Sequence, residues 1–396
     1  MTTADTSVVA RLGGETFLAR VFGREFRIAR GDATTVAGLL GWEDVNAILA
    51  RHRLEPPRLR LCSGGEMLPQ HLYTRPVTTR RNTVWNRIQP AALHERLAAG
   101  ATLVLDAADE LHARIGDLAA QLERDFRTGV QANLYASWTA NEGFGTHWDD
   151  HDVVVVQVAG AKRWRLYGPT RVAPMHRDVE APERPPDEPI ADLVLTPGDT
   201  LYVPRGWWHA VAAENGGRSL HLTFGLQSTT GADLIGWLAD TLRTHQAMRA
   251  DVPRLGSAQQ KRDFAETLLK LVTAELEAEG VVDRYAEFRD ATEQPRQAPS
   301  LPYVDGVPAS AGLPVRLLVS RASVTRDPDG RVVLTAGGEE WIFAPQVRAM
   351  LTLLLDGRSH RLGELAQASG VRVEQVAAVV TELVSGQVAH VGTVTT

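Results

Sequence analysis

The spacing of hydrophobic and polar residues changes near residue 129 and again near residue 229. Between these points, short runs rich in β-branched and aromatic residues alternate with Gly, Pro and Asp turns; the runs are VQANLYASW, DVVVVQVAG, RWRLYG, TLYVPR and SLHLTFGLQ. Runs of this composition, bounded by turn residues, predict β-strands. Because no helical pattern separates them, the middle of the chain is expected to form an antiparallel sandwich or barrel.

Helical patterns flank this β-rich middle. Residues 1–90 mix helical and irregular signals, and a helical stretch is predicted over PAALHERLAAGATLVLDAADELHARIGDLAAQLERDF, where apolar residues recur at three- and four-residue spacing. Residues 229–290 are again amphipathic and helical. They carry more apolar positions than the surface of one chain should, so they either cover the sheet domain or form a dimer face; the most apolar cluster is Leu268, Leu269, Leu271 and Val272.

Two further segments complete an α+β chain. Residues 291–313 are rich in Pro, Ala and Ser, which predicts a linker that does not pack. Residues 314–396 begin with two strand-like runs, VRLLVSRASV and RVVLTA, and continue with three helical ones, an order that resembles a small winged-helix module. The predicted boundaries are therefore 1–228, 229–290, 291–313 and 314–396.

Winged-helix modules often bind DNA, and charge indicates whether this one does. Residues 314–396 contain eight arginines, no lysines and eight acidic residues. The second helical candidate, around RLGELAQAS, has almost no basic residues. Because a DNA contact needs several cations that neutralise phosphates, we expect a role in protein interaction or packing instead.

Composition limits the location and the partners of the protein. Of its 396 residues, 44% are hydrophobic and 23% are charged, as in ordinary globular proteins, and the net charge of −6 argues against attraction to nucleic acid or anionic membranes. The start, MTTADTSVVARLGG, lacks a signal-peptide pattern, and no apolar run approaches the roughly 20 residues of a membrane span. The single cysteine, Cys62, excludes internal disulfides and cysteine-based zinc clusters. A cytoplasmic protein is expected.

One polar cluster stands directly ahead of the most strand-like run, in GTHWDDHDVVVVQVAGAKRW. His147, Asp149 and His151 share one parity, so in an extended chain they point to the same side, whereas Asp150 points the other way. His147 and Asp149 form an H-x-D pair of metal-binding donors. His151 is interpreted as a residue beside the site or at the substrate mouth, with a ligand role as the alternative.

A second motif lies 62 residues further on, in GDTLYVPRGWWH. Pro204-x-Gly206-x-x-His209 predicts a tight turn between two strands, with His209 at the start of the second. The pattern resembles the second metal motif of cupin barrels. Two imidazoles and one carboxylate on one face form the facial triad of non-haem Fe(II) oxygenases, which leaves positions for a co-substrate and O₂. The alternative is that His147 and His209 are ordinary core histidines.

Together these motifs resemble the JmjC branch of the 2-oxoglutarate oxygenases, and within it the ribosomal oxygenase group. The resemblance is carried by THWDDHDVVVVQVAGAKRWRLY, LYVPRGWWHAV and RSLHLTFGL, and it extends to ETFLARVFGREFRIARG, to the helices after residue 229 and to the tail. It implies a catalytic double-stranded β-helix (cupin, jelly-roll) domain over 1–228, a helical dimerisation region over 229–290 and a C-terminal winged helix. It also implies the use of Fe(II), 2-oxoglutarate and O₂.

The resemblance further implies roles for individual residues. His147, Asp149 and His209 would hold the iron. Lys162, fifteen residues after His147, would pair with the distal carboxylate of 2-oxoglutarate, and a charge-assisted hydrogen bond suits a dianion. The alternative for Lys162 is a solvated lysine in a turn beside Arg163.

Three more positions match residues that help to seat the co-substrate in relatives. Asn133 and Tyr135 lie on the strand before the H-x-D pair, and Thr223 lies on the last strand. Buried Asn and Tyr side chains that bond within the sheet would give the same pattern. Gly225 stands near a position where some relatives carry a hydroxyl residue, so the resemblance does not imply that contact here; the iron site is not affected.

The substrate is expected by analogy alone. Ribosomal oxygenases hydroxylate an Arg or His side chain of a ribosomal protein, and a Trp beside the pocket can stack on such a group. The same chemistry on a peptide or small molecule of a biosynthetic pathway is the first alternative, and a non-enzymatic metal-binding cupin is the second; the predicted dianion anchor favours an enzyme. The mouth would be lined by Trp148, Asp150, His151 and one of Trp207 and Trp208, since at least one of these two must pack in the barrel.

Overall fold

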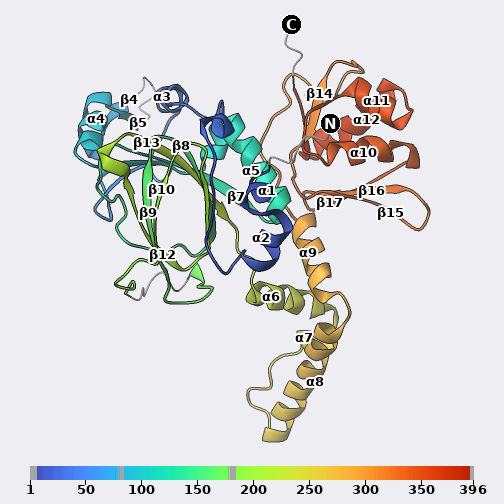
Figure 1. Cartoon of the computed structure of the whole chain (residues 1–396). Helices are drawn as coiled ribbons and strands as arrows, with labels where there is room; N and C mark the ends of the chain where they lie inside the picture. The colour runs from blue at the N-terminus through green and yellow to red at the C-terminus, as the bar shows by residue number, and fades with distance from the viewer. Residues whose placement is uncertain (1–6, 79, 81–83, 177, 179–183, 393–396) are drawn as a thin grey trace. The chain divides into compact units, whose positions relative to one another are not determined.

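The computed structural model divides into two compact units, Met1–Gln227 and Ser228–Thr396. Each unit mixes helices and strands (Figure 1), which confirms the α+β class. The structure describes residues 7–78, 80, 84–176, 178 and 184–392. The last residues of the predicted 314–396 segment, 393–396, therefore lie outside the described part.

The first unit is built on two antiparallel sheets. The strand order is β1-β11-β8-β13-β7-β6-β2-β3 in the large sheet and β10-β9-β12 in the small one, and β4 and β5 form a separate hairpin. The large sheet contains β1 (Arg27–Ala29), β2 (Leu59–Ser63), β3 (Glu66–Met67), β6 (Thr102–Leu105), β7 (Val130–Ser137), β8 (Asp152–Ala159), β11 (Thr200–Val203) and β13 (Ser219–Leu226). The other strands are β4 (Thr74–Thr78), β5 (Val84–Ile88), β9 (Lys162–Pro169), β10 (Ala191–Leu195) and β12 (Trp207–Ala213).

Along the strands of the large sheet, successive side chains point to opposite faces. On β7 and β13, even-numbered residues such as Leu134 and Leu222 join a core with the helices of this unit. Those helices are α1 (Val8–Leu12), α2 (Gly14–Arg20), α3 (Trp42–Arg51), α4 (Pro90–Ala98) and α5 (Ala113–Phe126). Odd-numbered residues of the same strands are left to face the small sheet.

The two sheets pack face to face around a second, smaller core. It contains Val153 and Val155 of β8, Leu201 and Val203 of β11, and Trp164 of β9 from the opposite sheet. The five strands read from the sequence in this region are confirmed as β7, β8, β9, β11 and β13. The inner face of this sandwich is the place where polar residues of odd parity gather.

Two expectations about the N-terminal part are wrong. The helical stretch predicted after residue 89 is interrupted by β6, and all four residues of that strand are buried. Fully buried strands lack the polar alternation that distinguishes them from helix, which explains the error. The segment expected to be helical or irregular before residue 90 also contains the short strands β1 to β5.

The second unit begins with helices and ends in a small mixed domain. The helical prediction for 229–290 is confirmed by α6 (Gly231–Thr241), α7 (Gln246–Arg249), α8 (Ala258–Glu277) and α9 (Val281–Ala291). The end contains sheets β18-β14-β19 and β15-β16-β17. Their elements are β14 (Pro314–Leu317), β15 (Ser323–Arg326), β16 (Val332–Ala336), β17 (Glu339–Phe343), α10 (Arg348–Leu354), β18 (His360–Arg361), α11 (Leu362–Ser369), α12 (Val373–Ser385) and β19 (Ala389–Val391).

The segment 291–313 does pack, contrary to the prediction. It has no helix or strand beyond Ala291, yet Val307 and Leu313 are buried in the core of the C-terminal domain. Glu293 is also buried, and its carboxylate accepts backbone N–H bonds from Ser320 and Arg321. The many Pro and Ala residues thus give a segment without helix or strand, while its few apolar residues are still buried in a core.

Within the part of the chain that the structure describes, no helix is both long and apolar enough to cross a membrane.

Candidate metal centre

Backbone pairing brings the two halves of the predicted triad together. His147 and His209 form an isolated antiparallel bridge, in which each backbone N–H donates to the carbonyl of the other, at 3.0 and 2.7 Å. The H-x-D pair therefore lies just before β8, which begins at Asp152, and not on the strand itself. A register shift between Trp208 and His209 on β12 is the kind of irregularity that redirects a side chain at a functional site.

Further contacts of the Pro-Arg-Gly turn fix the position of Asp149. The backbone N–H of Gly206 donates to the Asp149 carbonyl at 2.8 Å. Gly206 has a φ of +79° and packs so tightly that an added Cβ would lie 2.6 Å from Pro174 Cδ, so only glycine fits. Asp152 accepts from the Arg205 N–H at 2.8 Å and ties the same turn to the start of β8.

The two histidines present the same ring nitrogen to a common point. His147 Nδ1 lies 3.0 Å from the Gly145 carbonyl and His209 Nδ1 lies 2.9 Å from the Trp207 carbonyl. A carbonyl only accepts, so each Nδ1 carries the proton and each Nε2 has a free lone pair. Burial, with the neighbouring His147, lowers the pKa of His209 to about 4. His209 is therefore neutral near pH 7, as a metal ligand must be.

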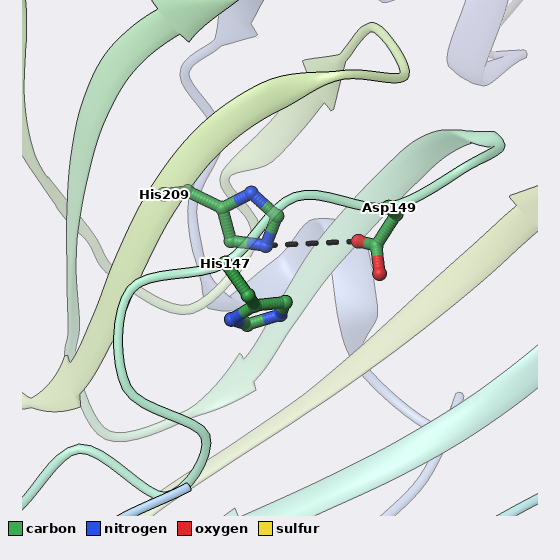
Figure 2. Close-up of side chains that lie close together, drawn as sticks. All are labelled: His147, Asp149 and His209. Atoms are coloured by element: carbon green, nitrogen blue, oxygen red, sulfur yellow. Dashed lines mark ion pairs between the residues drawn. The ribbon is translucent and has the colours of Figure 1, made fainter. Parts of the chain in front are cut away.

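The resulting cluster has the composition and spacing of a metal site. One ligand atom each from His147, Asp149 and His209 lies within 4.8 Å of the others, and the His209 Nε2 to Asp149 Oδ2 distance is 3.6 Å. Figure 2 shows the carboxylate and the two rings facing one another, with the His209 to Asp149 contact dashed. Two imidazoles and a carboxylate on one side of a centre suit Fe(II).

Lys162 lies between the two sheets and not in solvent. Its side chain is 3% exposed, and its ammonium donates to Ser137 Oγ at 2.5 Å. Burial lowers the pKa of Lys162 to about 8. The neighbouring Arg163 points outward instead and pairs with Asp192 and Glu214. The alternative of a solvated turn lysine is thus contradicted, and the interior holds a cation that donates a hydrogen bond to a neutral hydroxyl.

This burial predicts a pH effect on stability. Between the folded pKa of about 8 and the ordinary 10.5, the unfolded chain holds a proton that the folded chain has released, so Lys162 makes folding more favourable as the pH rises. Lys162→Met has no ammonium to bury, so we expect it to be more stable than the metal-free wild type at pH 7. This difference in the free energy of unfolding should shrink by about 2–3 kcal/mol between pH 7 and 10. Urea unfolding at several pH values measures the difference, and a constant difference would contradict a buried ammonium.

Asn133, Tyr135 and Thr223 lie together on the inner face, as their parity requires. Thr223 pairs with Asn133 across β13 and β7, and Tyr135 pairs with His221. The Asn133 side chain hydrogen-bonds Tyr135, and burial together with the charge of Asp149 raises the pKa of Tyr135. Tyr135 is thus hydrogen-bonded to Asn133 and lies close enough to Asp149 for the carboxylate charge to act on its hydroxyl.

Sequence reasoning missed three residues of this interior. Ser137 is the partner of Lys162. The His221 ring stacks on Tyr135 with centroids 4.9 Å apart, and the Trp164 ring stacks on His209 at 5.5 Å. Period-two counting from Tyr135 and from Thr223 would have reached Ser137 and His221, because both lie two residues away on the same face.

His151 occupies the space beside Gly225. A Cβ at Gly225 would lie 2.7 Å from His151 Cδ2, so this ring stands where a side chain at position 225 would project. Its Nδ1 is 2.9 Å from Asp150 Oδ1, and His176 Nδ1 is 3.0 Å from Asp150 Oδ2. His151 is not part of the three-residue cluster, which agrees with a place at the mouth.

Both tryptophans of the second motif are packed. Trp207 and Trp208 are 9% and 4% exposed; Trp207 contacts Phe26, and Trp208 Nε1 donates to Thr170 Oγ1 at 2.8 Å. The half-buried Trp148 meets the edge of Trp208 at a centroid distance of 6.4 Å. Trp148 is therefore the tryptophan of the predicted mouth that retains a partly exposed ring.

Comparisons with known protein sequences agree with this geometry. Residues 108–234 match the JmjC domain family. The bifunctional lysine-specific demethylase and histidyl-hydroxylase NO66 of Drosophila persimilis is 40% identical over 110 residues, which cover 28% of this chain and 16% of that protein. Human ribosomal oxygenase 1 is 29% identical over 236 residues, which cover 58% of this chain and 35% of that one. The matched parts thus span well under two thirds of these relatives.

Solved structures extend the likeness to nearly the whole chain. The X-ray structure of Escherichia coli ycfD superposes with a TM-score of 0.58 at 19% identity and covers 95% of this chain and 97% of that one. The ribosomal oxygenase YcfD in complex with cobalt and 2-oxoglutarate gives a TM-score of 0.57 at 18% identity, covering 96% and 98%. Residues 108–234 therefore match the JmjC domain family, in a chain that shares the fold of the Escherichia coli protein YcfD.

Proposed function

We propose that the protein is an Fe(II)- and 2-oxoglutarate-dependent hydroxylase that acts on a protein side chain. One observation carries this proposal: the His147, Asp149 and His209 cluster shares its barrel with the buried ammonium of Lys162. A non-enzymatic metal-binding cupin would have no use for such a cation. A 2-oxo acid with a second carboxylate would use both the metal and the lysine.

The donor set fits the proposed groups. Three protein ligands on one side of Fe(II) leave positions for 2-oxoglutarate and O₂, and the bound metal would supply the oxidising chemistry. Nε2 of His147 and His209, with a carboxylate oxygen of Asp149, would hold the iron. Lys162, steadied by Ser137, would orient the co-substrate, and the packed interior around Trp164 would exclude water.

An Arg or His side chain of a ribosomal protein is the proposed target. The names of the NO66 and ribosomal oxygenase 1 relatives support a protein substrate. A pocket of about 530 Å³ is lined by Arg60, Asp106, Gln131 and Asn133, among others. Because Asn133 also bonds Tyr135 beside the triad, this polar pocket is a suitable entrance for a planar, hydrogen-bonding side chain. A ribosomal target would place the protein in the cytoplasm.

The architecture around the site completes the proposal. We infer that the two facing sheets form a double-stranded β-helix, that 229–290 is a dimerisation region and that the C-terminal domain is a winged helix that does not bind DNA. The dimer is supported by α8, none of whose residues is buried, with Leu269 65% exposed. Helices that merely covered a sheet would bury one face.

Succinate release with and without ribosomes tests the proposed function. The protein is loaded with Fe(II), supplied with 2-oxoglutarate and O₂, and incubated with a purified ribosome fraction. We expect ribosomes to stimulate turnover, and mass spectrometry to find one added oxygen atom on one ribosomal protein. Uncoupled turnover without that product would instead favour a peptide or small-molecule substrate. Absence of turnover with iron bound would contradict the enzyme.

A further inference from the structure

Two buried nitrogen atoms inside the barrel have no hydrogen-bond partner among the described residues. They are Trp164 Nε1 and His221 Nδ1, and their side chains are only 3% and 4% exposed. Most buried polar groups in proteins are paired, and an unpaired one calls for an explanation. An indole N–H can only donate, so the missing partner of Trp164 must be an acceptor.

Packing prevents either ring from turning to another partner. Trp164 stacks on His209 with an interplanar angle of 30° and meets the edge of His221 at a centroid distance of 5.9 Å. His221 lies flat against Tyr135, with an interplanar angle of 5°. Stacking therefore holds both rings in the interior, and the Trp164 ring contacts His209 of the metal cluster.

A cation stands next to both rings. Lys162 precedes Trp164 by two residues on β9, so both side chains project from the same face of the strand. Burial, together with the charge of the nearby Lys162 ammonium, holds the pKa of His221 well below its usual range, so this imidazole is neutral. A ligand that accepts from a lysine, an indole and an imidazole must be rich in acceptor oxygens, as a carboxylate is.

We propose that Trp164 Nε1 and His221 Nδ1 donate, together with Lys162 Nζ, to the distal carboxylate of 2-oxoglutarate. The neutral imidazole then carries its proton on Nδ1, and the carboxylate gains three donors from two faces of one pocket. This inference rests on the proposed function and adds two residues to the lysine-serine pair. Trp164 would also connect the distal carboxylate with the metal site, because its ring stacks on the metal-binding His209.

The test measures the contribution of the distal carboxylate to binding separately from that of the rest of the co-substrate. Trp164→Phe and His221→Phe each remove one donor and keep an aromatic ring for stacking. Calorimetry measures the binding of two acids to the purified, Mn(II)-loaded protein. One is 2-oxoglutarate, and the other is 2-oxobutyrate, which lacks the distal carboxylate. Each variant is expected to weaken 2-oxoglutarate binding on the order of tenfold. Binding of 2-oxobutyrate and of Mn(II) is expected to stay unchanged.

Two control variants match these changes outside the barrel. His112 also has a buried, unpartnered Nδ1 but precedes α5, and Trp42 packs on Trp138 at the start of α3. His112→Phe and Trp42→Phe should leave both acids bound as in the wild type. Unchanged 2-oxoglutarate binding in both barrel variants, or equal weakening for the two acids, would overturn the inference and leave the proposed function standing. A wild type that binds no 2-oxoglutarate would overturn both.

Discussion

Replacement of His209 by alanine is expected to abolish turnover of 2-oxoglutarate and to remove tight Fe(II) binding. His209 is 3% exposed, and its Nε2 is the lone-pair nitrogen that faces Asp149 and His147. The variant keeps two protein ligands, and both lie on the loop before β8. The metal would therefore lose the one ligand that belongs to the small sheet. Succinate release should fall to the level of a buffer control, and Fe(II) should be lost on gel filtration.

A second ligand change guards against an effect of folding. Asp149 is 32% exposed at its side chain, so Asp149→Ala leaves little cavity and should preserve the fold while also abolishing turnover. His94→Ala, an exposed histidine on α4, is the matched control and should behave like the wild type. Normal turnover by either triad variant would show that the metal site has been assigned to the wrong residues.

Lys162→Ala is expected to raise the KM for 2-oxoglutarate by about 30-fold to several thousandfold, because losing one partner of a buried charge pair costs about 2–5 kcal/mol. Fe(II) binding should change little, since the cluster of possible metal ligands does not include Lys162. Steady-state kinetics at varied 2-oxoglutarate, with metal content measured in parallel, separates the two effects.

The chain provides a clean control for this substitution. Its other lysines are Lys261 and Lys270, and both lie exposed on α8. Lys270→Ala removes the same charge from an exposed position on a helix and should leave the KM unchanged. Equal effects on KM and on metal content in Lys162→Ala would contradict a role confined to the co-substrate.

The candidate site was largely predictable because its chemistry is written in local patterns. The H-x-D pair and the P-x-G-x-x-H turn each fix donors within a few residues, and the structure places His147, Asp149 and His209 together. What the patterns could not show is how the halves meet. That depends on a backbone bridge between His147 and His209, which joins segments with no regular spacing between them.

The missed interior residues follow the same logic. Ser137 and His221 lie on strands whose other inner-face residues were identified, but a serine and a histidine in a β-run have many ordinary explanations. Their role depends on Lys162, which reaches Ser137 from the opposite sheet. Contacts across two sheets leave no trace in the spacing of one strand.

The fold was predicted best where alternation is strict and worst where it is absent. The strands β7 and β13 place every second residue in the core shared with the helices, and both were located within a residue or two. The strand β6 is buried at every position, and it merged with the flanking helical patterns. The Pro-rich segment 291–313 was expected not to pack. Two apolar residues, Val307 and Leu313, are nevertheless enough to hold it against the core of the C-terminal domain.

Anaerobic titration of the Fe(II)-loaded protein with 2-oxoglutarate tests the central claim most directly. A 2-oxo acid that chelates Fe(II) held by the triad should produce a visible charge-transfer absorption band that saturates with 2-oxoglutarate, and the band should be absent from His209→Ala. The assignment of the triad as the iron site predicts this band without any protein substrate. Bound Fe(II) that gives no band with excess 2-oxoglutarate would contradict it.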